Sequence, residues 1–251
     1  ADERVKTAVL LAAQMAAAEA ACSRVLSGDA APADRQKASF FRGLMRFLQV
    51  VQTGAAAAAK ADGSVAYKPP TLAQVRPALA DVEAAIGLDG PLKGDALTLR
   101  ATINQTVGRS AEAKADVAEA IQAAPRDATP FVQRALEHER AGDVTAAMTD
   151  LDRALELDPN AGTALSARGD LLRRLGHLQR ARADLERAAA LGPPFRRLAL
   201  MRKSELELRA GDLHAAYDDI VAASRESGDL PKADAARQSA DLFVRAGWLA
   251  L

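Results

Sequence analysis

The most regular feature of the chain is a set of small, polar and turn-forming positions that recur every 34 residues in its middle. Six columns share this spacing: Pro125, Pro159 and Pro193; Gly108, Gly142 and Gly176; Arg100, Arg134 and Arg168; Asp116, Asp150 and Asp184; Ala113, Ala147 and Ala181; and Ala120, Ala154 and Ala188. Given one proline, chance agreement at both other positions is about two in a thousand, so six agreeing columns establish an internal repeat.

Each repeat predicts a helical hairpin. A first helix breaks at the glycine, and a second helix ends at the proline, which lacks an amide hydrogen and clashes with the preceding turn. The recurring alanines let the two helices approach closely. Larger apolar side chains fill the seam between them; these are Phe131, Leu151, Leu165, Leu172 and Leu185. Hydrophobic residues make up 49% of the chain and aromatics only 4%, which also favours helices over β-sheet.

These units resemble tetratricopeptide repeats (TPR). The family's signature sites are occupied in order by Leu165, Gly169, Leu172, Ala181, Leu185, Ala188 and Pro193. The unit at 128 departs from the signature at Ala135 and His138, and the unit at 94 departs at Asn104. We expect these departures to loosen the packing while keeping the repeat. The resemblance implies an all-α fold, a right-handed α-solenoid of antiparallel helical hairpins in a TPR-like superhelix.

The repeat extends in both directions with less regularity. Downstream, the run Arg-Ala-Gly-Asp-Leu from Arg209 matches the run Arg-Ala-Gly-Asp-Val from Arg140 at two periods plus one residue. Upstream, Arg42 and Gly43 match Arg168 and Gly169. The predicted organisation is: 1–32, an N-terminal helix or cap; 33–90, a degenerate first hairpin with an inserted loop at 53–70; hairpins at 94–127, 128–161, 162–196 and 197–229; and 230–251, a C-terminal capping helix.

The inserted loop interrupts the first hairpin between its two helices. Lengthening a turn by about 20 residues costs only about 1.5–2 kcal/mol of closure entropy, so the hairpin tolerates it. We interpret the segment as a mobile loop without function; the alternative is a lid or strap that folds over a binding groove.

The charge and cysteine content limit which partners and which kinds of site the chain can have. Lys plus Arg equals Asp plus Glu, at 33 each, so no global field attracts nucleic acid, and we expect no nucleic-acid partner. The apolar stretch at residues 5–21 contains Gln14 and Glu19 and is too interrupted for a membrane span. The single cysteine, Cys22, excludes an intrachain disulfide and a cysteine-cluster metal site. The oligomeric state is not determined by these features.

The residues around Cys22 bear on the cellular location of the protein. Cys22 follows two small residues, as in a secretory or lipoprotein signal, although Glu19 fits a cleavage site poorly. Residues 21–28, followed by Arg42 and Gly43, resemble the opening of a group of exported bacterial TPR proteins, which place a Cys and a Ser-Gly ahead of the first repeat. This resemblance implies a periplasmic or otherwise exported protein; the alternative is a cytoplasmic one.

A basic residue and an aspartate lie 16 residues apart in four successive units. The pairs are Arg100 with Asp116, Arg134 with Asp150, Arg168 with Asp184, and Lys203 with Asp219. We predict structural ion pairs between the helices of a hairpin. The alternative is a ladder of charges that contacts a ligand, which requires them to line the groove.

In the resemblance, ligands contact the inner face of each first helix. In this chain that face comprises Thr98, Thr102, Gln105, Val132, Leu136, Glu139, Arg140, Ser166, Asp170, Arg173, Arg174, Met201, Glu205 and Arg209. The Lys and Asn clamp that holds a C-terminal carboxylate in some members is absent, because those sites hold Thr98, Thr102 and Leu136. The arginines Arg140, Arg173, Arg174 and Arg209 suggest a basic patch for an acidic peptide; the alternative is a solvated helix face.

Signals of catalysis are weak. His138, His177 and His214 occupy different points of their hairpins, and no glycine-rich phosphate motif or serine elbow is present. We therefore predict no enzyme activity, no catalytic residue, no metal site and no cofactor. The predicted function is a protein- or peptide-binding scaffold or adaptor that uses the concave groove. The alternatives are a chaperone for exported or assembling proteins, or the docking module of a larger enzyme or sensor.

Overall fold

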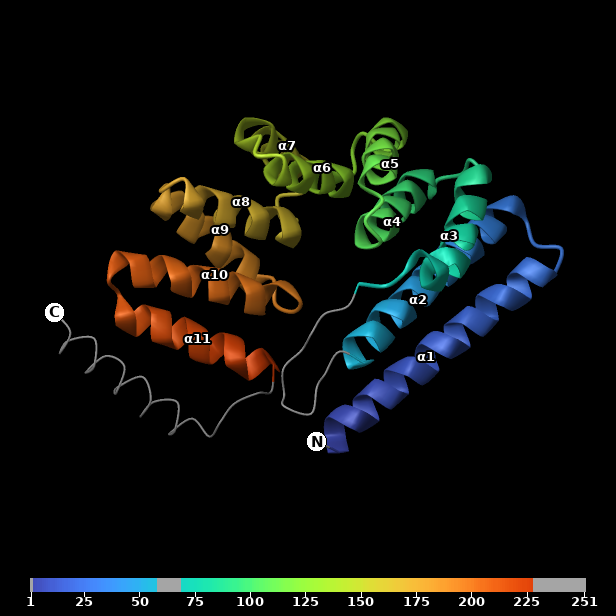
Figure 1. Ribbon diagram of the computed structural model, residues 1–251, viewed down its shortest axis with the longest axis horizontal. Helices are drawn as coiled ribbons and strands as arrows, with labels where there is room; N and C mark the ends of the chain where they lie inside the picture. The colour runs from blue at the N-terminus through green and yellow to red at the C-terminus, as the bar shows by residue number, and fades with distance from the viewer. Residues whose placement is uncertain (1, 58–68, 228–251) are drawn as a thin grey trace. The chain divides into compact units, whose positions relative to one another are not determined.

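The computed structural model describes residues 2–57 and 69–227, and these contain eleven helices and no strand (Figure 1). The helices are α1 (Asp2–Ser27), α2 (Pro32–Ala57), α3 (Leu72–Gly87), α4 (Lys93–Thr106), α5 (Ser110–Ala123), α6 (Ala128–Arg140), α7 (Val144–Leu157), α8 (Gly162–Arg174), α9 (Leu178–Ala190), α10 (Phe195–Ala210) and α11 (Leu213–Ser227). The predicted all-α fold is confirmed. None of the described helices is long and apolar enough to cross a membrane.

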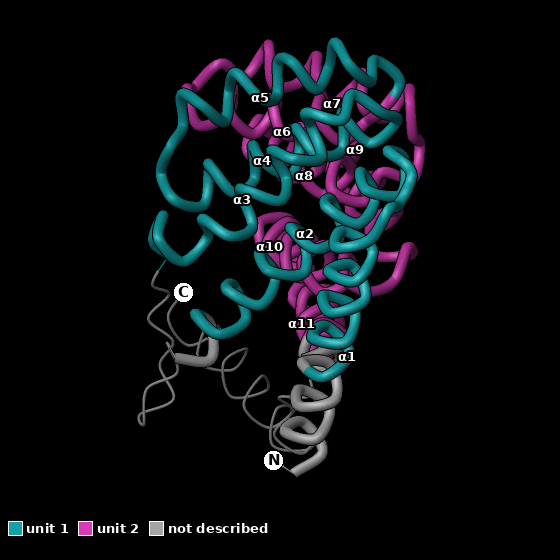
Figure 2. The backbone as a smooth tube through the Cα atoms, turned by 90° about the vertical axis from the view of Figure 1, so that its right-hand side faces the viewer, with its two compact units in different colours: residues 1–126 teal, residues 127–251 magenta. Residues whose placement is uncertain are grey.

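The chain forms two compact units, Ala1–Arg126 and Asp127–Leu251 (Figure 2). In the first unit α2 packs on α3 and α4 packs on α5, with α1 against α2. In the second unit α6, α8 and α10 each pack on the helix that follows, and α8 also contacts both α6 and α10. Each unit is therefore built from helical hairpins whose first helices are neighbours.

The turn inside each of the four regular hairpins, from α4–α5 to α10–α11, contains a glycine with positive φ. Gly142 and Gly176 both have φ of +81°, a left-handed conformation that glycine adopts without strain. The next amide closes the end of the first helix, as His177 N donates to Leu172 O at 2.9 Å. After Gly142, the Asp143 side chain caps α7 by accepting from Ala146 N at 3.0 Å. The predicted break between the two helices thus has a local chemical cause.

Small residues set the approach of the two helices. A Cβ at Gly169 would lie 2.8 Å from Leu185 Cγ, so α8 and α9 touch at a distance that a side chain would prevent. The seam residues predicted from the sequence are buried, Leu165, Leu172 and Leu185 completely. At the site equivalent to Gly169, α6 carries Ala135, which is also buried. The seams of the α6–α7 and α8–α9 hairpins are therefore close-packed around apolar side chains.

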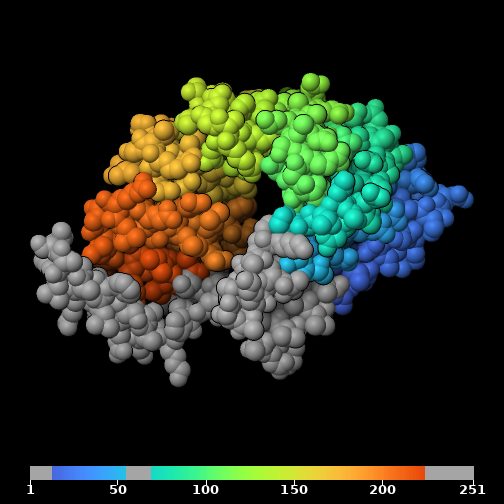
Figure 3. Space-filling view, in the orientation of Figure 1, coloured from blue at the N-terminus to red at the C-terminus, as the bar shows by residue number. Residues whose placement is uncertain are grey.

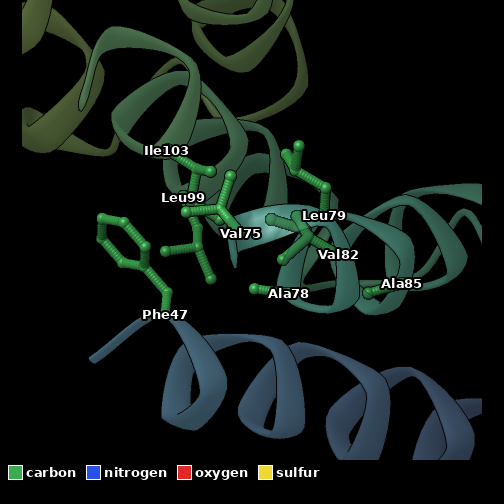
Figure 4. Close-up of a cluster of buried hydrophobic side chains, with 9 residues drawn as sticks. Phe47, Val75, Ala78, Leu79, Val82, Ala85, Leu99 and Ile103 are labelled. Atoms are coloured by element: carbon green, nitrogen blue, oxygen red, sulfur yellow. The ribbon is translucent and has the colours of Figure 1, made fainter. Parts of the chain in front are cut away.

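The core of the first unit joins three helices. Figure 4 shows Phe47 of α2 facing a cluster from α3 and α4 that includes Val75, Val82 and Ile103. All four are buried. The degenerate first hairpin is thus continuous with the regular repeat that follows it.

The structure describes only part of the predicted inserted loop and none of the predicted capping helix. Residues 53–57, the first part of the inserted loop predicted at 53–70, are helical, because α2 continues to Ala57. Alanine has the highest helix propensity, which explains why the alanines after Gly54 extend the helix instead of starting a loop. Residues 58–68, and the capping helix predicted at 230–251, lie outside the described residues.

Candidate functional site

All four predicted ion pairs form within their hairpins. The distances are 2.5 Å for Arg100 Nη2 to Asp116 Oδ1, 2.6 Å for Arg134 Nη2 to Asp150 Oδ1, 2.7 Å for Arg168 Nε to Asp184 Oδ2, and 3.2 Å for Lys203 Nζ to Asp219 Oδ1. A fifth pair, Arg42 Nη2 to Asp81 Oδ1 at 2.5 Å, occupies the same place in the first hairpin. The insertion separates its members by 39 residues, so the constant spacing of 16 does not reveal this pair.

The geometry supports a structural role for these pairs. The five aspartates are only 4–7% exposed, so their carboxylates face the neighbouring helix and not a ligand. The hydrogen bonds that Arg100 donates to Asp116 raise the pKa of Arg100 above its usual value, although burial opposes this rise. Asp150 acts in the same way on the pKa of Arg134. The alternative, in which these charges line a groove, does not fit their burial.

A second polar side chain reaches three of the buried aspartates. It lies four residues after the paired arginine on the first helix. Arg46 Nη1 lies 2.9 Å from Asp81 Oδ2, Asn104 Nδ2 donates to Asp116 Oδ2 at 3.0 Å, and His138 Nε2 lies 3.7 Å from Asp150 Oδ2. We expected Asn104 and His138 to loosen the packing. The structure shows each of them beside a buried carboxylate, and the expected loosening of the packing stays a prediction.

The predicted groove residues fall in two places. Gln105, with Thr98 and Thr102, lies on α4 in the first unit. The remaining residues lie on the three adjoining first helices of the second unit, on a side that we call the first-helix face. It consists of Val132, Leu136, Glu139 and Arg140 on α6; Ser166, Asp170, Arg173 and Arg174 on α8; and Met201, Glu205 and Arg209 on α10.

Exposure divides the first-helix face. Val132 and Ser166 are buried, and Leu136 and Glu139 are half-buried. The accessible members are Arg140, Arg174, Met201, Glu205 and Arg209. The accessible part of the first-helix face therefore lies mainly on α10 and at the C-terminal ends of α6 and α8.

The centre of the first-helix face is an ion-pair network. Arg173 is only 6% exposed, and its Nη2 lies 2.7 Å from Asp170 Oδ1 and 3.2 Å from Glu205 Oε2. Arg202 Nη1 reaches the same Asp170 oxygen at 3.3 Å, and Arg174 pairs with Glu139 of α6. Arginines and carboxylates thus neutralise each other across α6, α8 and α10. In the basic patch predicted for an acidic peptide, neighbouring carboxylates neutralise the charges of Arg173 and Arg174. Of the four arginines in that patch, Arg140 and Arg209 lie outside the network.

An apolar stripe lies beside this network on α10. Leu198, Met201 and Leu208 are 45–49% exposed, and their intervals of three and seven residues place them on one side of the helix. We call them the α10 stripe. The opposite side of α10 buries Ala199 and Leu206, so the helix is apolar on two sides.

Sequence reasoning named Met201 but missed Leu198 and Leu208. Leu208 lies 35 residues after Arg173, the register set by the extra residue between these two repeats. Leu208 could therefore have been predicted on this face from the position of Arg173. Figure 3 shows the surface of α8–α11 in yellow-orange to red.

Within the described ranges there is no group of three or more His, Cys, Asp or Glu residues arranged to hold a metal ion. The absence of enzyme activity and of cofactors stays a prediction.

Stacked helical hairpins, with a close-packed seam and a repeated internal ion pair, define this molecule as a helical-repeat solenoid. Residues 132–194 and 166–231 match the family model described as tetratricopeptide repeat. The resemblance inferred from the 34-residue spacing is therefore confirmed over this part of the chain.

Solved structures of similar fold include several TPR proteins. PilW, described as a widely conserved type IV pilus biogenesis factor, has a TM-score of 0.53 and 24% identity, covering 62% of this chain and 71% of its own. Yeast Tom70 has a TM-score of 0.58 and 18% identity, covering 92% of this chain and 43% of its own. The human IFIT1 dimer with m7Gppp-AAAA has a TM-score of 0.58 and 20% identity, and the match covers 82% of this chain and 44% of the IFIT1 chain.

No curated protein sequence matches the chain. At these identities the structural likeness establishes the fold alone. The partner, and the expectation that it is not a nucleic acid, stay predictions.

Proposed function

We propose that the chain is a protein- or peptide-binding scaffold whose partner contacts the first-helix face of the second unit. The observation that carries this proposal is the α10 stripe: three large apolar side chains, nearly half exposed, on one side of a helix that already buries its other side. Covering each of them stabilises a complex by about 1 kcal/mol, because each has about half of its surface left to bury. Contiguous exposed apolar side chains of this kind mark interaction sites.

The neighbouring charges indicate what kind of segment fits. The network around Arg173 is internally paired, so it attracts neither an acidic nor a basic partner strongly. A bound segment therefore takes its affinity from a few apolar anchors against Leu198, Met201 and Leu208, with polar contacts to Glu205 and Arg209 at the edge. An extended or helical peptide with apolar side chains at regular spacing meets this description.

Substitution within the α10 stripe tests the proposal. Peptides selected by display on the wild-type protein are expected to bind Met201→Glu and Leu208→Glu at least about tenfold more weakly, because a charge replaces an apolar contact. Fluorescence anisotropy with a labelled peptide measures the change in Kd. A chaperone would instead bind many unrelated apolar peptides with similar affinity.

Leu175→Glu is the matched control. Leu175 is as exposed as Met201 but lies half a turn around α8 from Ser166, away from the first-helix face. Its affinity for the selected peptides should equal that of the wild type. Equal weakening in the control, or full affinity in both α10 variants, argues against this surface.

We also propose that the protein is exported, to the periplasm in a bacterial cell. The support is the segment with Cys22, Ser27 and Gly28, which lies at the end of α1 ahead of the first hairpin. Expression of the complete coding frame with a C-terminal tag, followed by fractionation against cytoplasmic and periplasmic markers, should place the protein with the periplasmic marker. Recovery with the cytoplasmic marker would leave the cytoplasmic alternative.

A further inference from the structure

A pocket in the first unit lies between the end of α1 and the start of α2. Its volume is about 540 Å³, and ten residues from these two helices and the turn between them line it. The two helices lie side by side and pack on each other (Figure 1). The pocket shares no residue with the first-helix face of the second unit, so the scaffold proposal does not account for it.

The pocket combines a hollow lined by small side chains with a large aromatic ring. Ala21, Ala30 and Ala38 leave the space of the hollow open. Phe41 belongs to the same lining and is 47% exposed. Its ring lies edge-on to the ring of Phe40, with 5.2 Å between the centroids, and Phe40 packs on the core of the first unit. An exposed apolar side chain that its neighbour holds in place therefore lies beside a hollow large enough for an aromatic ring.

The charged residues of the lining carry both signs. Arg24 and Lys37 are cationic, Asp34 is anionic, and all three are exposed. Within the described part of the chain, none of the three has an ion-pair partner within 4.0 Å. A partner of one charge sign would match one sign of this surface and leave the other unmatched. A partner that carries the same charges in the opposite order matches both signs.

We propose that this surface pairs with the same surface of a second copy of the chain, about a two-fold axis. Asp34, Lys37 and Phe41 lie on one side of α2, at intervals of three and four residues. When two α2 helices pack antiparallel with the axis midway between Asp34 and Lys37, each Lys37 faces Asp34 of the other copy. The same rotation places each Phe41 opposite Ala30 of the other copy, so that each ring enters the other hollow.

The size of the surface predicts a weak dimer. Ten lining residues on each side are fewer than the roughly 20–30 of a standard interface, so we expect a Kd of about 10–100 µM. Phe41 is the anchor of the interface, because it is the largest exposed apolar side chain of the lining. Pairing about a two-fold axis uses the surface of both copies, so the assembly closes at the dimer.

Sedimentation velocity of the full chain between about 5 and 500 µM tests the proposal, because this range spans the expected Kd. We expect the sedimentation coefficient to rise from that of a monomer to that of a dimer, without larger species. Phe41→Glu should weaken self-association at least about tenfold, because it removes the anchor and places a charge in the hollow. Leu175→Glu, a substitution of a similarly exposed apolar residue in the second unit, should dimerise as the wild type does.

Two charge variants separate two-fold pairing from unspecific association. Lys37→Glu makes positions 34 and 37 both acidic, and Asp34→Lys makes them both basic. Each variant alone should dimerise at least about tenfold more weakly than the wild type, because like charges then face each other across the axis. An equimolar mixture of the two should recover the wild-type Kd as a heterodimer, because each acidic position faces a basic one. Both positions are exposed, so both variants should keep the wild-type circular dichroism spectrum.

Three results would overturn the proposal. The first is a chain that stays monomeric over the whole concentration range. The second is wild-type dimerisation in Phe41→Glu, and loss of the dimer in Leu208→Glu alone would show that the copies pair through the α10 stripe instead. The third is a mixture of the two charge variants that associates no better than either alone. Phe41→Glu should bind the display-selected peptides with wild-type affinity, so this proposal and the scaffold proposal can fail separately.

Discussion

Replacing Asp184 by alanine is expected to lower the free energy of unfolding by about 3–5 kcal/mol. Asp184 accepts from Arg168 Nε at 2.7 Å and from Arg168 Nη2 at 2.9 Å, and it is buried between α8 and α9. Without it, a guanidinium that is only 17% exposed loses its buried partner, and the desolvation of that charge is no longer compensated. Urea unfolding followed by circular dichroism measures the loss.

Asp152→Ala is the matched control for Asp184→Ala. Asp152 contacts the same arginine, with Arg168 Nη1 at 2.7 Å from its Oδ1, but its side chain is 48% exposed. Solvent screens this second contact, so the expected loss is at most about 1 kcal/mol. If the two alanine variants lose equal stability, burial does not decide the strength of these pairs and the structural interpretation of the ladder is wrong.

Arg182→Ala is expected to cost about 3 kcal/mol, at the low end for a broken buried pair because Arg182 is 36% exposed. Arg182 Nη2 donates to Glu207 Oε2 at 2.6 Å, and this links α9 to α10 across neighbouring hairpins. Glu207 is almost completely buried, so the truncation leaves a carboxylate without its cation inside the protein. The same urea experiment measures the effect.

The opposite result is expected when the carboxylate itself is removed. Glu207→Leu installs the residue type that α8 carries as Leu172, and the Arg182 side chain that it leaves behind is 36% exposed, so water solvates the guanidinium in place of the carboxylate. We expect a change within about 1 kcal/mol. A loss in Glu207→Leu as large as that in Arg182→Ala would show that the ion pair stabilises the fold beyond the burial of its members.

The hairpins could be predicted because their causes are local. Gly176 ends α8 through its own backbone conformation, and the residues of the seam are set by sterics within one repeat. The pairing of Arg168 with Asp184 could also be predicted, because a constant spacing inside a constant hairpin produces a constant contact. Arg42 and Asp81 escaped the same reasoning only because an insertion changed their spacing.

The chemistry of the candidate surface could be predicted only in part. The sequence indicated which helix side carries Arg173 and Arg174, but not that both are neutralised. Their partners Glu205 and Glu139 lie on other hairpins, and such contacts depend on how repeats stack and on side-chain length. Burial of Val132 and Ser166 has the same origin. Periodicity therefore identifies a face, while neighbouring repeats decide which of its charges are available.

The proposed function requires a partner to bind across the α10 stripe on the first-helix face of the second unit. Photo-crosslinking with a peptide selected by display tests it most directly. A photoreactive amino acid is placed at position 201, at position 208 or at position 175, and the product is read by mass spectrometry. We expect crosslinked peptide from positions 201 and 208 and none from position 175. Crosslinking from position 175 alone, or equally from all three, would contradict it.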